Sequence, residues 1–172
     1  MFFFKPQVSE ADLDLDHFEQ EDLSNDLFLS KDLRTCKKRN NGWSTVYGQR
    51  IYSEGTHVIK IKIKEDKKMT YGQTFGVVNA FQKHLKTTFR HSEGYSYIPW
   101  GNGRKSNSSS EKPYGQTFKK WDVIGVHLDM DMKTLSFSKN GKNFGIAYSD
   151  IPEKVCLAVD LQWDGTKVSI VC

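Results

Sequence analysis

Long apolar runs are absent from this chain of 172 residues. No stretch approaches the ~20 apolar residues that a membrane-spanning helix needs. The N-terminal MFFFKPQ has only three consecutive apolar residues after Met1, whereas the core of a signal peptide has about 7–15. We therefore expect no membrane partner, no secretion and a cytoplasmic location.

Cysteine is scarce as well, with three residues at Cys36, Cys156 and Cys172. An odd, widely spaced set fits neither a disulfide framework nor a zinc site. The five histidines show no His-x-x-x-His or related ligand spacing. This pattern is typical of a reducing, intracellular environment, and it predicts neither a metal nor another cofactor.

Catalytic motifs are missing too. Asp129 and Asp131 in HLDMDMK resemble part of a calcium loop, but a third oxygen ligand, the sixth-position glycine and the twelfth-position glutamate are absent. GYSYI at 94–98 lacks the second glycine of a nucleophile elbow. The body shows no sequence cluster of carboxylates like a glycosidase pair. We predict no catalytic residue and no enzyme, which disfavours a sandwich-type hydrolase.

Short segments with strand character fill the chain from Leu27 onward, and turn residues such as Asn40-Asn41-Gly42 and Asp164-Gly165 separate them. The segments are LFLS, LRTCKK, WSTVYG, RIYS, HVIKIKIK, TFGVVNA, GYSYIPW, VIGVHLD, TLSFSKN, NFGIAYS, VCLAVDL and KVSIVC. Many short strands at regular spacing predict an all-β sandwich or barrel. The stretches Asn107–Lys112 and Lys83–Glu93 are predicted to be loops.

The stretch LSFSKNGKNFGIA, at 135–147, is the clearest local signal. Apolar and polar residues alternate on both sides of Asn140-Gly141, and this pair supplies the two positive-φ positions of a type I′ turn. A phosphate-binding loop would run into a helix, and no helical pattern follows. The stretch predicts a β-hairpin.

Charge is divided unevenly along the chain. Ser9–Asp32 holds nine acidic residues and one lysine, whereas the chain from Leu33 onward holds 23 basic and 12 acidic residues. We expect an acidic arm over residues 1–25, irregular or partly helical, and a folded domain over residues 26–172. Phe18 and Leu23 are the residues that could dock this arm on the body. Its negative charge fits either binding to the basic body or a role in keeping the chain soluble.

The run HVIKIKIKEDKK, at 57–68, alternates isoleucine with lysine. Ile59, Ile61 and Ile63 would face the core and the lysines would face outward. The lysines fit either a nucleic-acid stripe or the solvated face of a half-buried strand. We favour the solvated face, and predict no nucleic-acid partner, because no base-stacking aromatic is interleaved in the run.

Two short sequence repeats suggest a β-propeller as an alternative architecture. YGQTF occurs at 71–75 and 114–118, and Trp-Asp at 121–122 and 163–164. A period near ~40 with Trp-Asp endings is typical of propellers. The preceding step would place Trp-Asp at 79–80, where the chain has Asn79-Ala80. This break in the period disfavours the propeller.

Aromatic residues near predicted turns are the best functional lead. Tyr95, Tyr97 and Trp100 precede Gly101-Asn102-Gly103, and Trp163 stands beside Asp164-Gly165. Such residues either cover the core or anchor a ligand, and tryptophan and tyrosine are the types that dominate binding hot spots. Both interpretations stay open for these residues.

The C-terminal half resembles the SPRY domain family. The residues that carry the resemblance are Asp122-Val123-Ile124-Gly125, Leu128-Asp129-Met130-Asp131, Leu135-Ser136-Phe137, Asn140-Gly141, Gly145-Ile146-Ala147-Tyr148 and Leu157-Ala158-Val159. LFLSKDLRT, WSTVYG and SEGTHVIKIKI are similar to the family's first strands, although Val58-Ile59-Lys60 stands where aromatic-Trp-Glu is usual. The resemblance covers Asp26 to Cys172.

This resemblance implies a bent antiparallel β-sandwich with a concanavalin-like jelly-roll topology. It also implies a non-enzymatic, monomeric module that binds a protein or short peptide through its loops. SPRY domains commonly serve as substrate-recruiting parts of ubiquitin ligases or as scaffolds. A lectin-like sandwich that binds glycans on aromatic platforms is the alternative.

The family's peptide contacts come from three places. They fall here near Lys38 or Arg39, near Tyr97 or Trp100, and at Gln162-Trp163-Asp164, where only the tryptophan matches the family's hydrophobic-Trp-Gly triplet. The resemblance implies that Trp163 is an apolar anchor and that Arg39 pairs with an acidic or carbonyl group.

Overall fold

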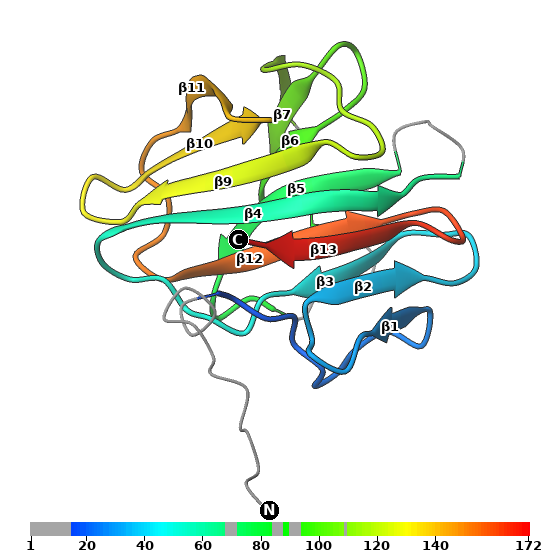
Figure 1. Cartoon of the computed structure of the whole chain (residues 1–172). Helices are drawn as coiled ribbons and strands as arrows, with labels where there is room; N and C mark the ends of the chain where they lie inside the picture. The colour runs from blue at the N-terminus through cyan, green and yellow to red at the C-terminus, as the bar shows by residue number, and fades with distance from the viewer. Residues whose placement is uncertain (1–14, 68–71, 84–87, 90–93, 109) are drawn as a thin grey trace, which may run out of the picture.

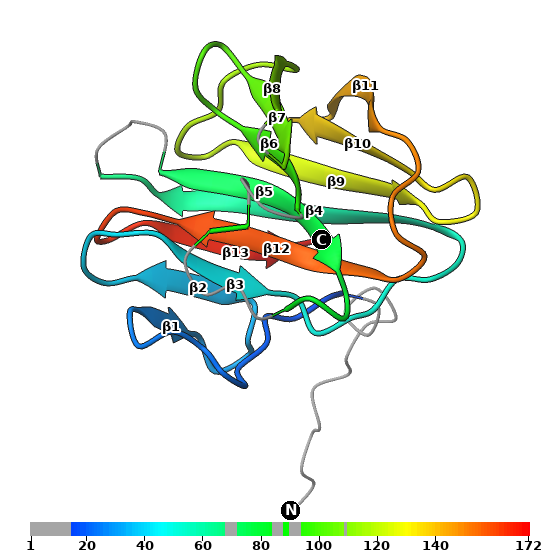
Figure 2. The ribbon, with the colours of Figure 1, turned by 180° about the vertical axis from the view of Figure 1, so that it is seen from behind.

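A computed structural model of the chain describes residues 15–67, 72–83, 88–89, 94–108 and 110–172. Strands of the described residues form two antiparallel sheets that lie one behind the other (Figures 1 and 2). The all-β sandwich predicted from the strand pattern is therefore confirmed. No helix in this part of the chain is long and apolar enough to cross a membrane.

The front sheet of Figure 1 has seven strands and the rear sheet has six. In spatial order the seven-stranded sheet contains β1 (Leu27–Leu29), β2 (Thr35–Lys38), β13 (Lys167–Val171), β4 (Thr56–Glu65), β9 (Val123–Asp129), β10 (Thr134–Lys139) and β11 (Lys142–Tyr148). The six-stranded sheet contains β3 (Ser44–Tyr47), β12 (Val155–Leu161), β5 (Gln73–Asn79), β6 (Tyr95–Ile98), β7 (Arg104–Asn107) and β8 (Ser110–Pro113).

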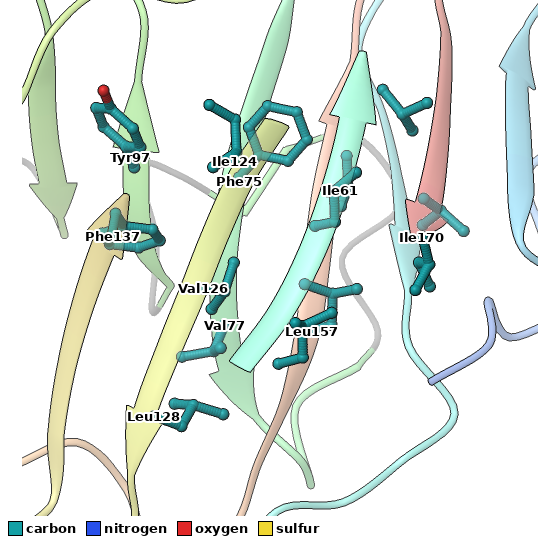
Figure 3. Close-up of a cluster of buried hydrophobic side chains, with 14 of the residues drawn as sticks. Ile61, Phe75, Val77, Tyr97, Ile124, Val126, Leu128, Phe137, Leu157 and Ile170 are labelled. Carbon is teal, nitrogen blue, oxygen red and sulfur yellow. The ribbon is translucent and has the colours of Figure 1, made fainter. Parts of the chain in front are cut away.

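The main core lies between the sheets. Ile59, Ile61 and Ile63 of β4 are buried, whereas the lysines between them are partly or fully exposed, as the alternation predicted. Figure 3 shows Ile61 and Ile124 from one sheet beside Phe75 and Leu157 from the other. Burial of these apolar side chains is the main stabilising term of the sandwich.

The predicted hairpin at Asn140-Gly141 is confirmed. Lys139 pairs with Lys142 across a two-residue turn, and the φ angles of Asn140 and Gly141 are 51° and 85°. Both angles are positive, as a type I′ turn requires.

Two segment assignments were wrong. Arg50–Ser53 forms no strand, and only Tyr52 makes an isolated bridge, to Val155. Asn107–Lys112 was predicted to be a loop, yet Ser110–Pro113 is strand β8, paired with β7. This hairpin is polar because it closes the edge of its sheet, where much of the surface stays hydrated, so its composition resembles that of a loop.

The described part of the acidic arm packs against the body. Phe18 is fully buried and bridges Gly48, and Leu23 packs at the edge of the core, so the predicted docking of these two side chains is confirmed. Asp16 is also buried, and burial raises the pKa of its carboxyl group. Residues 15–26 contain no helix, and the rest of the helix candidate, from Glu10, lies outside the described residues.

Alternate connections meet at one end of the sandwich, which we call the loop end. It carries the β2–β3, β6–β7, β8–β9, β10–β11 and β12–β13 connections, because Leu161 pairs with both Ser44 and Gln73, and Lys139 pairs with Ile124. Figure 1 shows the β2–β3 and β12–β13 loops side by side at the right. Five of the seven predicted site residues lie in or beside these two loops.

Candidate functional site

Hydrogen bonds join the β2–β3 and β12–β13 loops. Gly165 N donates to Lys38 O over 2.9 Å, and Lys38 N donates to Thr166 O over 2.8 Å. Gly42 N donates to Gln162 O over 2.9 Å, and Asp164 N donates to the Asn41 side chain over 3.1 Å. Such a network holds both loops in one arrangement without a ligand.

Trp163 is half-buried on this double loop, where the β4–β5 connection supports it. Gln162 N donates to Gly72 O over 2.9 Å, and a Cβ atom at Gly72 would overlap the Trp163 ring. Glycine is therefore required at position 72 for the indole to lie against the backbone. The ring is fixed on one side and partly open on the other.

Arg39 is the exposed cation of the same loops. Its guanidinium carbon lies 3.4 Å from the centre of the Phe28 ring, and Phe28 itself is 38% exposed. Stacking of this kind orients the guanidinium and leaves its in-plane N–H donors available for an acceptor. Arg39, Gln162, Trp163 and Asp164 therefore lie on two loops that are hydrogen-bonded to each other, and we call these four residues the double-loop site.

Comparisons with known proteins agree with this architecture. The sequence profile described as "SPRY domain" matches residues 56–171. This chain belongs to the SPRY family.

Among solved structures, the SPRY domain of human HERC1 aligns with a TM-score of 0.76 at 20% identity, covering 89% of this chain and 96% of that one. The TRIM65 PSpry domain aligns with a TM-score of 0.74 at 11% identity, covering 92% of both chains. At these identities the likeness shows the fold alone.

Curated relatives are much longer than this chain and match it over a small part of their own length. A probable ATP-dependent RNA helicase ddx1 from Dictyostelium discoideum is 26% identical over 136 residues, which is 78% of this chain and 16% of the relative. Ran-binding protein 9 from Homo sapiens is 37% identical over 76 residues, 44% of this chain and 9% of the relative. The chain thus spans no more than about a sixth of these relatives, and the SPRY domain is a non-enzymatic interaction fold.

Lys38 does not reach the surface of the SPRY domain. Its side chain is 0% exposed, pairs with Asp26 over 3.4 Å and donates to Arg39 O over 3.1 Å. The hydrogen bond from Asn40 and then the charge of Lys38 hold the pKa of Asp26 below its usual value. A buried paired lysine is a structural residue, so the predicted contact role of Lys38 is wrong and only Arg39 remains.

Tyr97 is also a core residue. It is 0% exposed, and its ring centre lies 5.0 Å from that of Phe118 and 5.3 Å from that of Phe137. Its hydroxyl donates to Gln116 O and accepts from Gln116 N, and burial raises its pKa to about 12. Figure 3 shows the ring beside Phe137. The prediction that Tyr97 contacts a peptide is therefore wrong.

Trp100 lies at the loop end but in a different turn. It is half-buried in the β6–β7 connection, and its Nε1 donates to Glu111 Oε2 over 3.3 Å. Arg104 holds the same carboxylate over 3.2 Å. Because β6 is two strands from β12, roughly 10 Å at ordinary strand spacing, Trp100 lies apart from the double-loop site.

Two features of the loop end were missed from the sequence. One is Gly72: glycine is required at this position because of the contact with the Trp163 ring, which the sequence does not show. The other is Trp121, which is 59% exposed beside the lysines of β4. Within the described ranges, no three His, Cys, Asp or Glu side chains are grouped so that they could hold a metal ion.

Proposed function

We propose that this SPRY domain binds a short peptide or a protein surface at the double-loop site. The supporting observation is that two hydrogen-bonded loops carry the half-buried Trp163 and the exposed Arg39, the latter oriented by Phe28. Tryptophan and arginine in this setting are the residue types that most often dominate binding energy. No glycan-specific feature accompanies them, so a lectin function gains no comparable support.

The chemistry of the rim defines the ligand. An apolar side chain would pack on the open face of Trp163, and an acidic group or a backbone carbonyl would accept hydrogen bonds from Arg39. Asp164, which is exposed, would accept a backbone N–H of the same peptide. We therefore expect a motif that joins one apolar residue to one acidic residue.

The site needs little rearrangement to bind. Its loops are already hydrogen-bonded to each other, and the indole is already supported by Gly72. Prearranged contacts reduce the ordering cost of binding. In a larger assembly, such a domain would serve as a monomeric substrate-recruiting or scaffold part, as many interaction modules do.

A peptide-display selection tests this proposal directly. Random peptides selected on the wild-type domain and counter-selected on Trp163→Ala should share an apolar–acidic motif. A selected peptide should bind Trp163→Ala about 2 kcal/mol or more weakly, by calorimetry. Phe81→Ala, at an exposed aromatic of the opposite end of the sandwich, is the matched control and should bind normally.

Two results would contradict the double-loop site. Equal binding of the peptide by wild type and a folded Trp163→Ala would place the contact elsewhere. A Trp163→Ala variant that loses its cooperative thermal transition would show that the indole belongs to the core. Gly72→Ala should weaken binding without touching the peptide, because the added methyl group displaces the indole.

A further inference from the structure

Trp121 combines exposure with an unfavourable backbone conformation. The residue lies near the end of the β8–β9 connection, is 59% exposed and has a φ angle of 76°. Bulky residues rarely adopt positive φ, and glycine would fit this position without cost. An exposed aromatic kept in such a conformation points to a function, because neither packing nor the turn requires it.

Two lysines from different elements lie against this indole. Lys120 Nζ is 4.8 Å and Lys62 Nζ is 5.5 Å from the ring centre, both within the range of cation–π attraction. Glu65 holds Lys120 through an ion pair of 3.1 Å, and Trp121 N donates to Ile63 O over 2.8 Å. The backbone of Trp121 is therefore tied to the end of β4, and two cations flank its ring.

The lysine row of β4 continues away from Trp121. Lys60, Lys62 and Lys64 alternate with buried isoleucines, so all three lie on the outer face of the seven-stranded sheet. Among the described residues, no carboxylate lies within 4.0 Å of these three ammonium groups. Successive lysines of such a row stand about 6.8 Å apart along the strand.

The sequence disfavoured a nucleic-acid partner because no aromatic residue is interleaved with the lysines, and the fold supplies that aromatic. The lysine run has no interleaved aromatic, but the fold brings Trp121 to it from a segment more than fifty positions later. A peptide of acidic residues alone would neutralise the lysines and leave the indole face uncovered. A nucleotide supplies both groups, a phosphate for the ammonium ions and a flat base for the ring.

We propose that the lysine–tryptophan patch, made of Lys60, Lys62, Lys64, Lys120 and Trp121, binds single-stranded nucleic acid. One base stacks on Trp121, and the flanking phosphates lie along the lysines of β4. The row is a strand surface without the shape to read base edges, so binding depends on charge and stacking rather than on sequence. The proposal is independent of the double-loop site.

Fluorescence anisotropy with a short labelled oligouridine at low salt is the test. The key variant is Trp121→Gly, which removes the ring and suits the positive φ, so the fold is retained. It should bind roughly five- to 150-fold more weakly, the loss expected for one stacked base. Phe81→Ala is the matched control, since Phe81 is 77% exposed with Lys154 5.7 Å from its ring centre at the opposite end, and it should bind normally.

The charge contribution is tested separately. Lys62→Gln should reduce the slope of log affinity against log salt by about 0.7 for one lost phosphate contact, whereas Lys154→Gln should leave the slope unchanged. Three results would overturn the proposal: no binding at low salt, unchanged affinity of a folded Trp121→Gly, or displacement of oligouridine by polyglutamate as readily as by unlabelled oligouridine. The last result would assign the patch to acidic protein segments.

Discussion

The outer faces of the two sheets differ in how they are covered. On the six-stranded sheet every residue of β12 is buried, and Phe89 packs in one buried cluster with Cys156 and Ala158 of that strand. On the seven-stranded sheet, β4 buries its isoleucines and exposes its lysines. Strand β12 thus contributes side chains to two buried apolar clusters, whereas β4 contributes to one. The outer face of the seven-stranded sheet at β4 is therefore accessible to a partner.

Removing the Phe89 side chain, which covers the outer face of β12, should have the largest effect on stability. Phe89 is fully buried with Tyr47, Val78, Cys156 and Ala158, so Phe89→Ala should lower the free energy of unfolding by about 3–5 kcal/mol. Urea denaturation measures it. The exposed Phe81→Ala should change the same quantity by less than about 0.5 kcal/mol. A loss below about 1 kcal/mol for Phe89→Ala would mean that the cover is not part of the cooperative core.

The next largest effect on stability is expected from the hydrogen bonds that Asp160 accepts beneath Phe89. Asp160, buried in β12, accepts from Thr45 Oγ1 over 2.6 Å, from Thr88 Oγ1 over 2.5 Å and from Phe89 N over 3.2 Å. Asp160→Ala leaves these three donors, two of them buried, without this acceptor and should cost about 3 kcal/mol. Lys62→Ala, on the open sheet, should cost little. Hydrogen exchange of the Phe89 amide gives a local readout, and unchanged protection in Asp160→Ala would contradict the role of the carboxylate.

The contrast between the faces was only partly predictable. The Ile–Lys alternation of β4 predicted one buried and one open face, and the open face was found. The apolar run VCLAVDL predicted a strand, but its cover comes from a separate connection that local pattern does not place. Contacts between β12 and a distant connection depend on the pairing register of the strands, and this register is set by pairing across the whole sheet rather than by local sequence.

The candidate site shows the same limit. Cys36 and Lys38 are two positions apart in β2, so their side chains point to the same face of the sheet. A buried Cys36 therefore predicts that the Lys38 side chain points inward. Tyr97 was predicted to contact a peptide because GYSYIPW ends at a turn, whereas its pairing with Phe75 directs the ring into the core. Trp121 meets Lys62 only through the fold, and no local pattern reports that contact.

A smaller effect, of opposite sign, is expected at Trp121 on the open face. The positive φ of this residue is costly for tryptophan and free for glycine. Trp121→Gly should therefore leave the free energy of unfolding unchanged or raise it by up to about 1 kcal/mol, after the loss of its cation–π contacts. Thermal unfolding monitored by circular dichroism measures it. A clear fall in midpoint would show that the indole stabilises the turn and weaken the case for a functional residue.

The smallest effect is a pH dependence on the same open face. Burial, and then the charge of Lys60, lower the pKa of His127, whose Nε2 lies 2.7 Å from Ser138 Oγ. The unfolded chain therefore binds more protons than the folded chain just below pH 6.5, the ordinary pKa of histidine. Stability should be full above pH 6.5 and fall as pH decreases through the folded-state pKa. His127→Gln should flatten this part of the stability profile in urea titrations. Lys60→Gln should make the loss of stability smaller, because removing the nearby positive charge brings the folded-state pKa of His127 closer to its ordinary value. An unchanged profile in both variants would mean that the open sheet face contributes nothing to the acid sensitivity of the fold.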